Sequence, residues 1–135
     1  MIKNFLAALF AVLSLAAGSA SAQPTTSPTL GKIKAAKAIN VAYSADSLPF
    51  SVNGPNGAPV GYSIDLCKRV VAQIGRAVGE PELKVNWMPG SVAERLQMVA
   101  SGRAELDCAN TTQTQSRLAN VDFSNLVFID AAGVV

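Results

Sequence analysis

The stretch LKVNWMPGSVAERLQMVASGRAELDCA, residues 83–109, decides the fold class. Apolar and polar residues alternate at its beginning, which is the pattern of a half-buried strand. Ser91 and Glu94 then have the S-x-x-E spacing of a capping box, and they predict a helix that Gly102 ends. Residues 104–109 follow that glycine and predict another strand. A strand, a helix and a strand in this order predict a parallel α/β unit with a right-handed crossover.

The preceding part of the chain adds a strand and a helix to the same unit. Residues 39–44 alternate between apolar and smaller or polar side chains and predict a strand. A helix is then expected from Ser63, which would cap it, to the helix breakers Gly79 and Pro81. Apolar residues recur at helical spacing at Cys67, Val70, Val71, Ile74 and Val78, and in the helix after Ser91 at Val92, Leu96 and Val99. The complete order predicts a mainly parallel, three-layer α/β sheet.

Two smaller elements are also expected before residue 62. Residues 30–38 contain lysines among alanine and isoleucine and predict a short helix. Residues 46–61 are rich in glycine, proline and asparagine, and they predict a small hairpin in which 50–52 face 59–61.

The loops that leave the carboxyl ends of the predicted strands are the candidate site, because open parallel sheets bind ligands there. These loops comprise residues 44–49 and 110–117, and the second reads NTTQTQSR. The guanidinium of Arg117 is a planar fork that can bind both oxygens of a carboxylate, and threonine hydroxyls and loop N–H groups can donate to the same atoms. The pattern therefore fits the binding of a small carboxylate, with an ordinary polar surface loop as the alternative.

The first 22 residues have the pattern of a secretory signal peptide. A positively charged start precedes an apolar run over residues 5–17, which is too short to span a membrane. Ala20-Ser21-Ala22 fits an A-x-A site and predicts cleavage between Ala22 and Gln23. An uncleaved helix is the alternative. Residues 23–29 are then expected to be a disordered leader and 30–135 the folded part, exported to a bacterial periplasm.

Composition excludes several classes of function. The chain has 135 residues with 11 basic and 9 acidic side chains, and removing Lys3 with the signal peptide would leave a net charge of +1. No basic cluster indicates a nucleic-acid or membrane-surface partner. With no histidine and two cysteines, no metal site and no cofactor are expected.

The two cysteines are expected to form a disulfide. Cys67 lies on the apolar stripe of the first predicted helix, and Cys108 lies on a strand that this helix could cover. An exported chain meets oxidising conditions, which favour such a bond. Two separate buried thiols are the alternative.

The motifs together resemble family 3 of the periplasmic solute-binding proteins. The resemblance rests on SADSLPFSV at 44–52, PVGYSIDL at 59–66 and CANTTQTQSRLANVDFS at 108–124. It implies the first lobe of a type II periplasmic-binding-protein-like fold, which would bind an amino acid or similar small carboxylate for a membrane ABC permease. We also expect a monomer and no enzymatic activity.

The resemblance further implies roles for individual residues. Arg117, followed by D-F-S, falls on the arginine that binds the ligand α-carboxylate, and Thr112 falls on the hydroxyl that assists it. Asn110 stands where relatives have glycine or serine near the ligand amino group. On the side that sets specificity, Ser44 stands where binders of acidic amino acids have arginine, and Ser47 where others have an aromatic residue.

Three further residues have weaker assignments. Val92 falls where relatives have the serine or phenylalanine wall of the site. Phe50 and Trp87 could each line a pocket, with ordinary core or rim packing as the alternative.

The chain stops at Val135, before the second lobe of the family, which predicts a fragment or a truncated gene product. A functional single lobe is the alternative. Two other functions are also considered. A dehydratase-like enzyme of the same fold would need an acid or base in the cleft, where Asp46 and Glu94 are the nearby carboxylates. A sensory lobe of a receptor would need a membrane span downstream.

Overall fold

The structure is a computed structural model that describes residues 27–129. The predicted signal peptide and its cleavage site at Ala22 and Gln23 lie outside the described residues.

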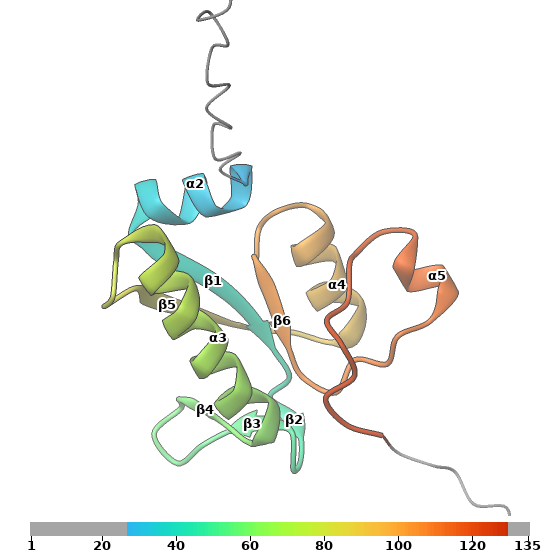
Figure 1. Cartoon of the computed structure of the whole chain (residues 1–135). Coiled ribbons are helices and arrows are strands. Elements are labelled where there is room, and N and C mark those ends of the chain that lie inside the picture. Colours follow the sequence, from blue (N-terminus) through green and yellow to red (C-terminus); the bar gives the residue numbers. More distant parts are fainter. Residues whose placement is uncertain (1–26, 130–135) are drawn as a thin grey trace, which may run out of the picture.

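A three-stranded parallel sheet forms the centre of the fold (Figure 1). β1 (Ala38–Tyr43) lies in the middle, β5 (Lys84–Pro89) on one side and β6 (Leu106–Cys108) on the other. Val41 pairs with Trp87 across one ladder and with Leu106 across the other. The predicted order of strands and helices and the parallel sheet are confirmed, although β6 is shorter than the expected strand.

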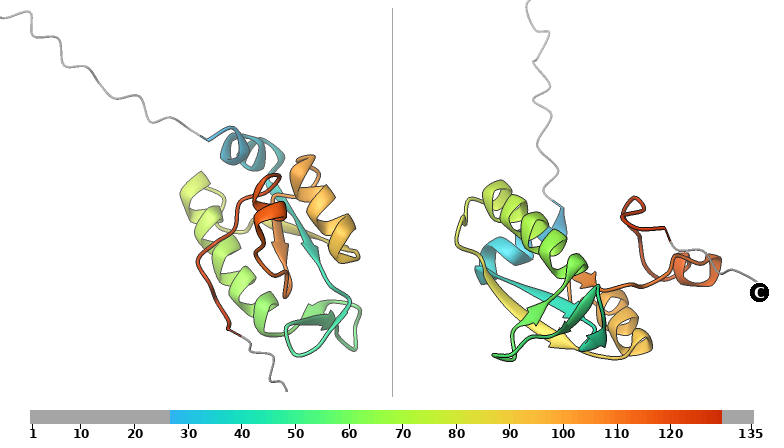
Figure 2. Two further views of the ribbon diagram at one scale, coloured as in Figure 1. Left: turned by 90° about the vertical axis from the view of Figure 1, so that its right-hand side faces the viewer. Right: turned by 90° about the horizontal axis from the view of Figure 1, so that it is seen from below.

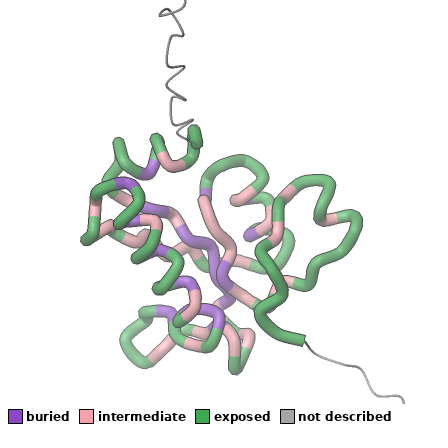
Figure 3. The backbone as a smooth tube through the Cα atoms, in the orientation of Figure 1, coloured by how far each residue is buried: buried purple, intermediate pink, exposed green. Residues whose placement is uncertain are grey.

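Two helices cover opposite faces of this sheet, which makes the three layers (Figure 2). α3 (Tyr62–Val78) and α4 (Val92–Ala100) are these helices. The side chains of β1 alternate between the two faces. Ile39, Val41 and Tyr43 belong to the core under α3, whereas Ala42 packs with Met98 and Ala104 on the α4 side. β1 is therefore the most deeply buried element, as the purple trace in Figure 3 shows.

The N-cap of α3 lies two residues earlier than the expected Ser63. The N-cap residue is Gly61, whose φ of 128° is a conformation that suits glycine. A Cβ at Gly61 would also collide with the Phe50 carbonyl oxygen. Ser63 is already helical, and its Oγ donates to the Ala109 carbonyl oxygen at 2.8 Å. The predicted cap at Ser63 is therefore wrong.

α4 begins as expected, but its most deeply buried residues are not those of the expected stripe. Its capping box at Ser91 and Glu94 is confirmed. The expected apolar stripe is confirmed only in part: Val99 is partly buried and packs against the core cluster that contains Met98, and Leu96 is partly buried. The fully buried residues of α4 are Arg95 and Met98. Val92 is exposed.

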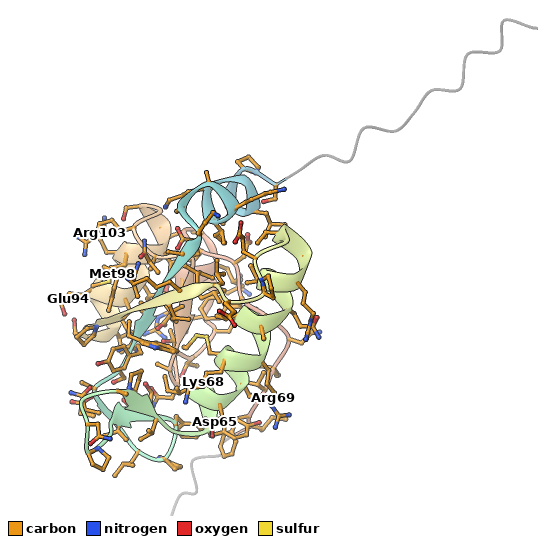
Figure 4. All side chains as sticks on the ribbon, turned by 90° about the vertical axis from the view of Figure 1, so that its left-hand side faces the viewer. Asp65, Lys68, Arg69, Glu94, Met98 and Arg103 are labelled. Atoms are coloured by element: carbon orange, nitrogen blue, oxygen red, sulfur yellow. A yellow bond between two sulfur atoms is a disulfide. The ribbon has the colours of Figure 1, made fainter. Side chains whose placement is uncertain are left out.

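α3 buries most of its expected stripe and presents charged residues on its outer side. The buried residues include Ile64, Cys67, Val71 and Val78, whereas Val70 is exposed. Asp65, Lys68 and Arg69 project from the outer surface of the helix (Figure 4).

The remaining elements are short. α2 (Pro28–Ala36) begins inside the segment expected to be disordered, and its Ile33 contributes to the core. β2 (Asp46–Ser47), β3 (Ser51–Asn53) and β4 (Pro59–Val60) form a small antiparallel sheet. The predicted hairpin is confirmed, but its first strand begins one residue later than expected and Val52 pairs with Val60. α5 (Gln115–Leu118) was not expected.

Candidate functional site

A hollow of about 730 Å³ lies between the loop after β6 and the last described segment of the chain. Asn110 and Thr112, both predicted site residues, are in its wall. The loop contributes residues 109–115, and the final segment contributes residues 123–129. Phe50 and Ser63 line the hollow from the region where α3 begins. Hydroxyls, amides and apolar side chains therefore meet around a space suited to a small molecule.

Two bonds attach the beginning of this loop to α3. Cys67 and Cys108 form the expected disulfide, with their Cα atoms 6.1 Å apart. One residue later, the Ala109 carbonyl oxygen accepts the hydrogen bond from the Ser63 hydroxyl. The backbone that enters Asn110 and Thr112 is therefore held by a covalent and a polar contact to the same helix.

Arg117 lies in α5, beyond the threonine-rich part of the loop. The Thr114 hydroxyl accepts a hydrogen bond from the Arg117 amide at 3.3 Å and so caps this short helix. Arg117 Nη1 donates to the Thr112 carbonyl oxygen at 2.6 Å. Among residues 27–129, the Arg117 guanidinium has no other hydrogen-bond partner. Its remaining donors are thus available to an anion.

The Arg117 side chain does not line the large hollow. It is partly buried and lines a separate groove of about 260 Å³ between α5 and α4. The structure thus brings Asn110 and Thr112 together on the hollow. It places Arg117 against the backbone of Thr112, in the wall of the neighbouring groove.

Ser44 and Ser47 belong to a polar cluster at the carboxyl end of β1. Ser44 is buried, its Oγ donates to Asp46 Oδ1 at 2.9 Å, and it lies 2.7 Å from Ser47 Oγ. The Ser51 hydroxyl donates to the Ser44 carbonyl oxygen at 2.7 Å. These contacts hold the turn from β1 into the small sheet. Ser44, Ser47 and Val92 line neither of the two hollows.

A buried ion pair beneath the loop was missed in the sequence. Arg95 is 1% exposed, and its Nε donates to Asp107 Oδ1 at 2.9 Å. Its other nitrogens donate to the Gly90 carbonyl oxygen at 2.7 Å and to Thr111 Oγ1 at 3.2 Å. The sequence contains an indication of this pair, because a charged residue inside a predicted buried strand needs a partner of opposite charge. Asp107 lies within the stretch predicted to be a strand.

Aromatic residues close the hollow at the far end of the loop. The rings of Phe50 and Phe128 meet edge to face with centroids 4.8 Å apart, and Tyr62 packs against both. The Tyr62 hydroxyl donates to the Val127 carbonyl oxygen at 2.7 Å. Phe50 therefore lines the site, whereas Trp87 packs against Tyr43 at the core.

The two carboxylates considered for catalysis make local contacts. Asp46 accepts the hydrogen bond from Ser44. Glu94 lies at the exposed start of α4 (Figure 4), where the Ser91 hydroxyl and amide lower its pKa below the ordinary value of about 4.5. Among the described residues, no cluster of side chains could hold a metal ion, and no helix is both long and apolar enough to cross a membrane.

Known proteins resemble this chain in sequence. Residues 39–135 match the model of the bacterial extracellular solute-binding proteins, family 3. The L-glutamate/L-aspartate-binding protein of Pseudomonas aeruginosa is 37% identical over 101 residues, which cover 74% of this chain and 33% of that protein. The chain therefore spans about a third of the length of this relative.

Solved structures resemble the fold over a similar range. The cysteine-binding protein from Campylobacter jejuni has a TM-score of 0.61 at 30% identity, covering 70% of this chain and 37% of that one. An ancestral cyclohexadienyl dehydratase has a TM-score of 0.62 at 23% identity, covering 73% and 38%. The type II periplasmic-binding-protein fold expected for the first lobe is thus confirmed.

Proposed function

The chain belongs to the bacterial extracellular solute-binding proteins of family 3, and on that premise we propose that it contributes the first lobe of the substrate-binding component of an ABC importer. Its ligand would be an amino acid or a similar small carboxylate. The observation that carries this proposal is the loop after β6, where hydroxyl and amide side chains face a hollow and Arg117 keeps donors free beside it.

The chemistry of the loop supports a carboxylate rather than a cation as the group that binds there. Arg117 is the one charged residue between Cys108 and Asp122, and it is positive. Its fork can donate two parallel hydrogen bonds to one carboxylate. Thr112 and Asn110 add a hydroxyl and an amide within the same loop. We assign Arg117 the role of anchor, and Thr112 and Asn110 the role of assisting groups.

Ser44, Ser47 and Val92 are proposed to influence specificity at the other side of the site. Ser44 and Ser47 are bonded to each other and to Asp46, so they would act by shaping the turn after β1. Ser44 and Ser47 carry no charge. They therefore favour a ligand whose side chain does not depend on an ion pair with the turn after β1. The relatives bind several amino acids by name, including glutamate, aspartate and cysteine.

Location and partners follow from the family and from the first 22 residues. We propose that the protein is exported to the periplasm, cleaved after Ala22, and delivers its solute as a monomer to a membrane permease. The contacts of Asp46 and Glu94 within their own turns support a structural use of both carboxylates rather than a catalytic one.

Calorimetry with the complete gene product would test the proposal. The panel would contain L-glutamate, L-aspartate, L-glutamine, L-cysteine and L-arginine, with γ-aminobutyrate as an analogue of glutamate that lacks the α-carboxylate. We expect at least one amino acid to bind. For a glutamate binder, γ-aminobutyrate should bind at least about a hundredfold more weakly, because an unpaired guanidinium is left in the site. Equal binding of both compounds would contradict the carboxylate site.

A further inference from the structure

The buried ion pair beneath the loop connects four parts of the chain, including the loop itself. Arg95 lies on α4, Asp107 lies on β6, and Gly90 lies in the link between β5 and α4. The Arg95 guanidinium donates to the Asp107 carboxylate and the Gly90 carbonyl, and its third contact is the hydroxyl of Thr111 in the loop. Side-chain exposure is 1% for Arg95 and 12% for Asp107. Such burial requires that the charges be paired and hydrogen bonded.

The hydroxyl of Thr111 is fixed from two directions. It donates to Asp107 Oδ2 at 2.6 Å and accepts from Arg95 Nη2 at 3.2 Å. Both of these partners are anchored in regular structure, so the Thr111 side chain has one favourable orientation. Thr111 lies between Asn110 and Thr112 in the chain, and fixing it restricts the backbone of both neighbours.

The restriction extends to the proposed anchor. The Thr112 carbonyl oxygen accepts the hydrogen bond from Arg117 Nη1 at 2.6 Å. A displaced Thr112 carbonyl would release or redirect the Arg117 guanidinium. A continuous series of contacts therefore runs from α4 through Arg95, Asp107 and Thr111 to the group that would meet the ligand.

We propose that Arg95 and Asp107 are positioning residues for ligand binding, and that they act through the Thr111 hydroxyl on Thr112 and Arg117. This inference rests on the proposed function, since it assigns the support of the same site. The guanidinium is required because its donors point in fixed directions toward three acceptors, which an ammonium cannot reproduce. Rigid support of this kind is what holds a binding group in its productive geometry.

Two variants of Thr111 separate this role from a general effect on folding. Thr111→Val removes the hydroxyl and keeps the branched shape, whereas Thr111→Ser keeps the hydroxyl. Glu105→Gln is the matched control, because Glu105 is also buried near β6 and paired, but with Lys32 and the Asn40 amide. That pair lies at the amino end of β1, away from the loop.

Hydrogen exchange of the complete gene product, without ligand, is the first measurement. We expect Thr111→Val to speed amide exchange in residues 110–118 about tenfold or more, as the loop opens locally. Thr111→Ser and Glu105→Gln should leave this segment unchanged. Unchanged exchange in Thr111→Val would overturn the proposal. Faster exchange spread evenly over the molecule would do the same, because it would indicate a merely structural role.

Calorimetry with L-glutamate, or with whichever amino acid of the panel the parent binds, is the second measurement. We expect Thr111→Val and Arg95→Lys to weaken binding about ten- to a hundredfold, the range seen when groups that orient metal ligands are removed. Thr111→Ser should bind within about threefold of the parent. Parent-like binding by Thr111→Val overturns the inference. A parent that binds no amino acid contradicts the proposed function instead, while hydrogen exchange still decides whether the Thr111 hydroxyl, held by Arg95 and Asp107, fixes the loop.

Discussion

At the scale of single residues, we propose two uses for Arg117, one in its own loop and one in ligand binding. One nitrogen, Nη1, holds the Thr112 carbonyl oxygen at 2.6 Å, and the rest of the guanidinium has no partner among residues 27–129. An arginine that is partly buried and already oriented loses less rotamer freedom when a ligand arrives. The same residue can therefore stabilise its own loop and bind a carboxylate.

Replacing Arg117 tests this double use. Arg117→Ala should weaken binding of the identified amino acid by about 2–5 kcal/mol, because the ligand carboxylate loses its charged partner. That loss corresponds to roughly thirty- to several-thousand-fold in Kd. Arg117→Lys should also bind poorly, since an ammonium lacks the fork. Arg103→Ala removes an exposed arginine beside Gly102 and is the control for charge (Figure 4). Calorimetry decides, and an Arg117→Ala protein that binds within twofold of the parent refutes the anchor.

Thr112 should contribute less than Arg117. Thr112→Val removes one donor but keeps the backbone carbonyl that Arg117 uses, so the expected cost is about 1–2 kcal/mol of binding free energy. The same calorimetric titration measures it. A Thr112→Val protein that binds as weakly as Arg117→Ala would mean that the hydroxyl, and not the guanidinium, is the main contact.

Glu94 makes the stability of α4 dependent on pH. The Ser91 hydroxyl and amide bind its carboxylate and lower its pKa below about 4.5. A lowered pKa in the folded state means that the stabilisation is present above about 4.5 and is lost as the pH falls through the folded value. The Tm of the parent should therefore exceed that of Glu94→Gln at pH 7, and the difference should shrink below pH 4.5. In a Ser91→Ala background the difference at pH 7 should be smaller but not absent, because the Ser91 hydroxyl is lost while its backbone amide still donates to the Glu94 carboxylate.

Residue patterns in the sequence predict the local capping contact of α4 but not its buried ion pair. The capping box needs only Ser91 and Glu94, three residues apart, so its spacing predicts it. The burial of Arg95 depends on Asp107, which is twelve residues away and on another element. No local periodicity records that pairing. With this pairing, Arg95 is buried together with Met98 in α4, whereas the apolar spacing favours Val92, Leu96 and Val99.

Among the elements, α3 and β6 are the pair on which the site depends. The disulfide joins them at Cys67 and Cys108, and the Ser63 hydroxyl adds a contact to the next residue along the chain. The sequence predicts both elements from their residue patterns, and the bond between them from the places of the two cysteines and the expected export. It placed the cap of α3 wrongly, because a close backbone approach at Phe50 requires Gly61, and sequence spacing does not show that approach.

Breaking this disulfide should destabilise the whole fold. The bond closes a separation of 41 residues, and constraint of an unfolded loop of this length stabilises by at most about 4 kcal/mol. Chemical denaturation of the parent with and without reductant should show a loss approaching this value. A Cys67→Ser/Cys108→Ser protein should resemble the reduced parent and should not respond to reductant. Equal unfolding midpoints for the oxidised and reduced parent would contradict a structural role for the bond.

At the scale of the whole molecule, the hollow lies between two segments of the chain, the loop after β6 and the last described residues. Its second wall is the segment 123–129, which carries exposed apolar residues including Leu126 and Ile129. The relative from Pseudomonas aeruginosa is about three times as long as the region matched here. The sequence motifs indicate the loop wall of the hollow. The second wall forms because residues 123–129 lie opposite this loop, and no local sequence pattern predicts that placement.

Export is the property of the whole molecule that the first 22 residues predict, and it determines the state of both cysteines. An exported chain should begin at Gln23, and Cys67 and Cys108 should resist alkylation because they are oxidised. Mass spectrometry of the periplasmic fraction from a Gram-negative host measures the mass and the free thiols together. Leu9→Arg interrupts the apolar run and should leave the full-length chain in the cytoplasm with two reactive thiols. A parent protein that stays full length in the cytoplasm would contradict the signal peptide. A processed parent with two free thiols would show instead that export occurs and that the bond between α3 and β6 does not form in the cell.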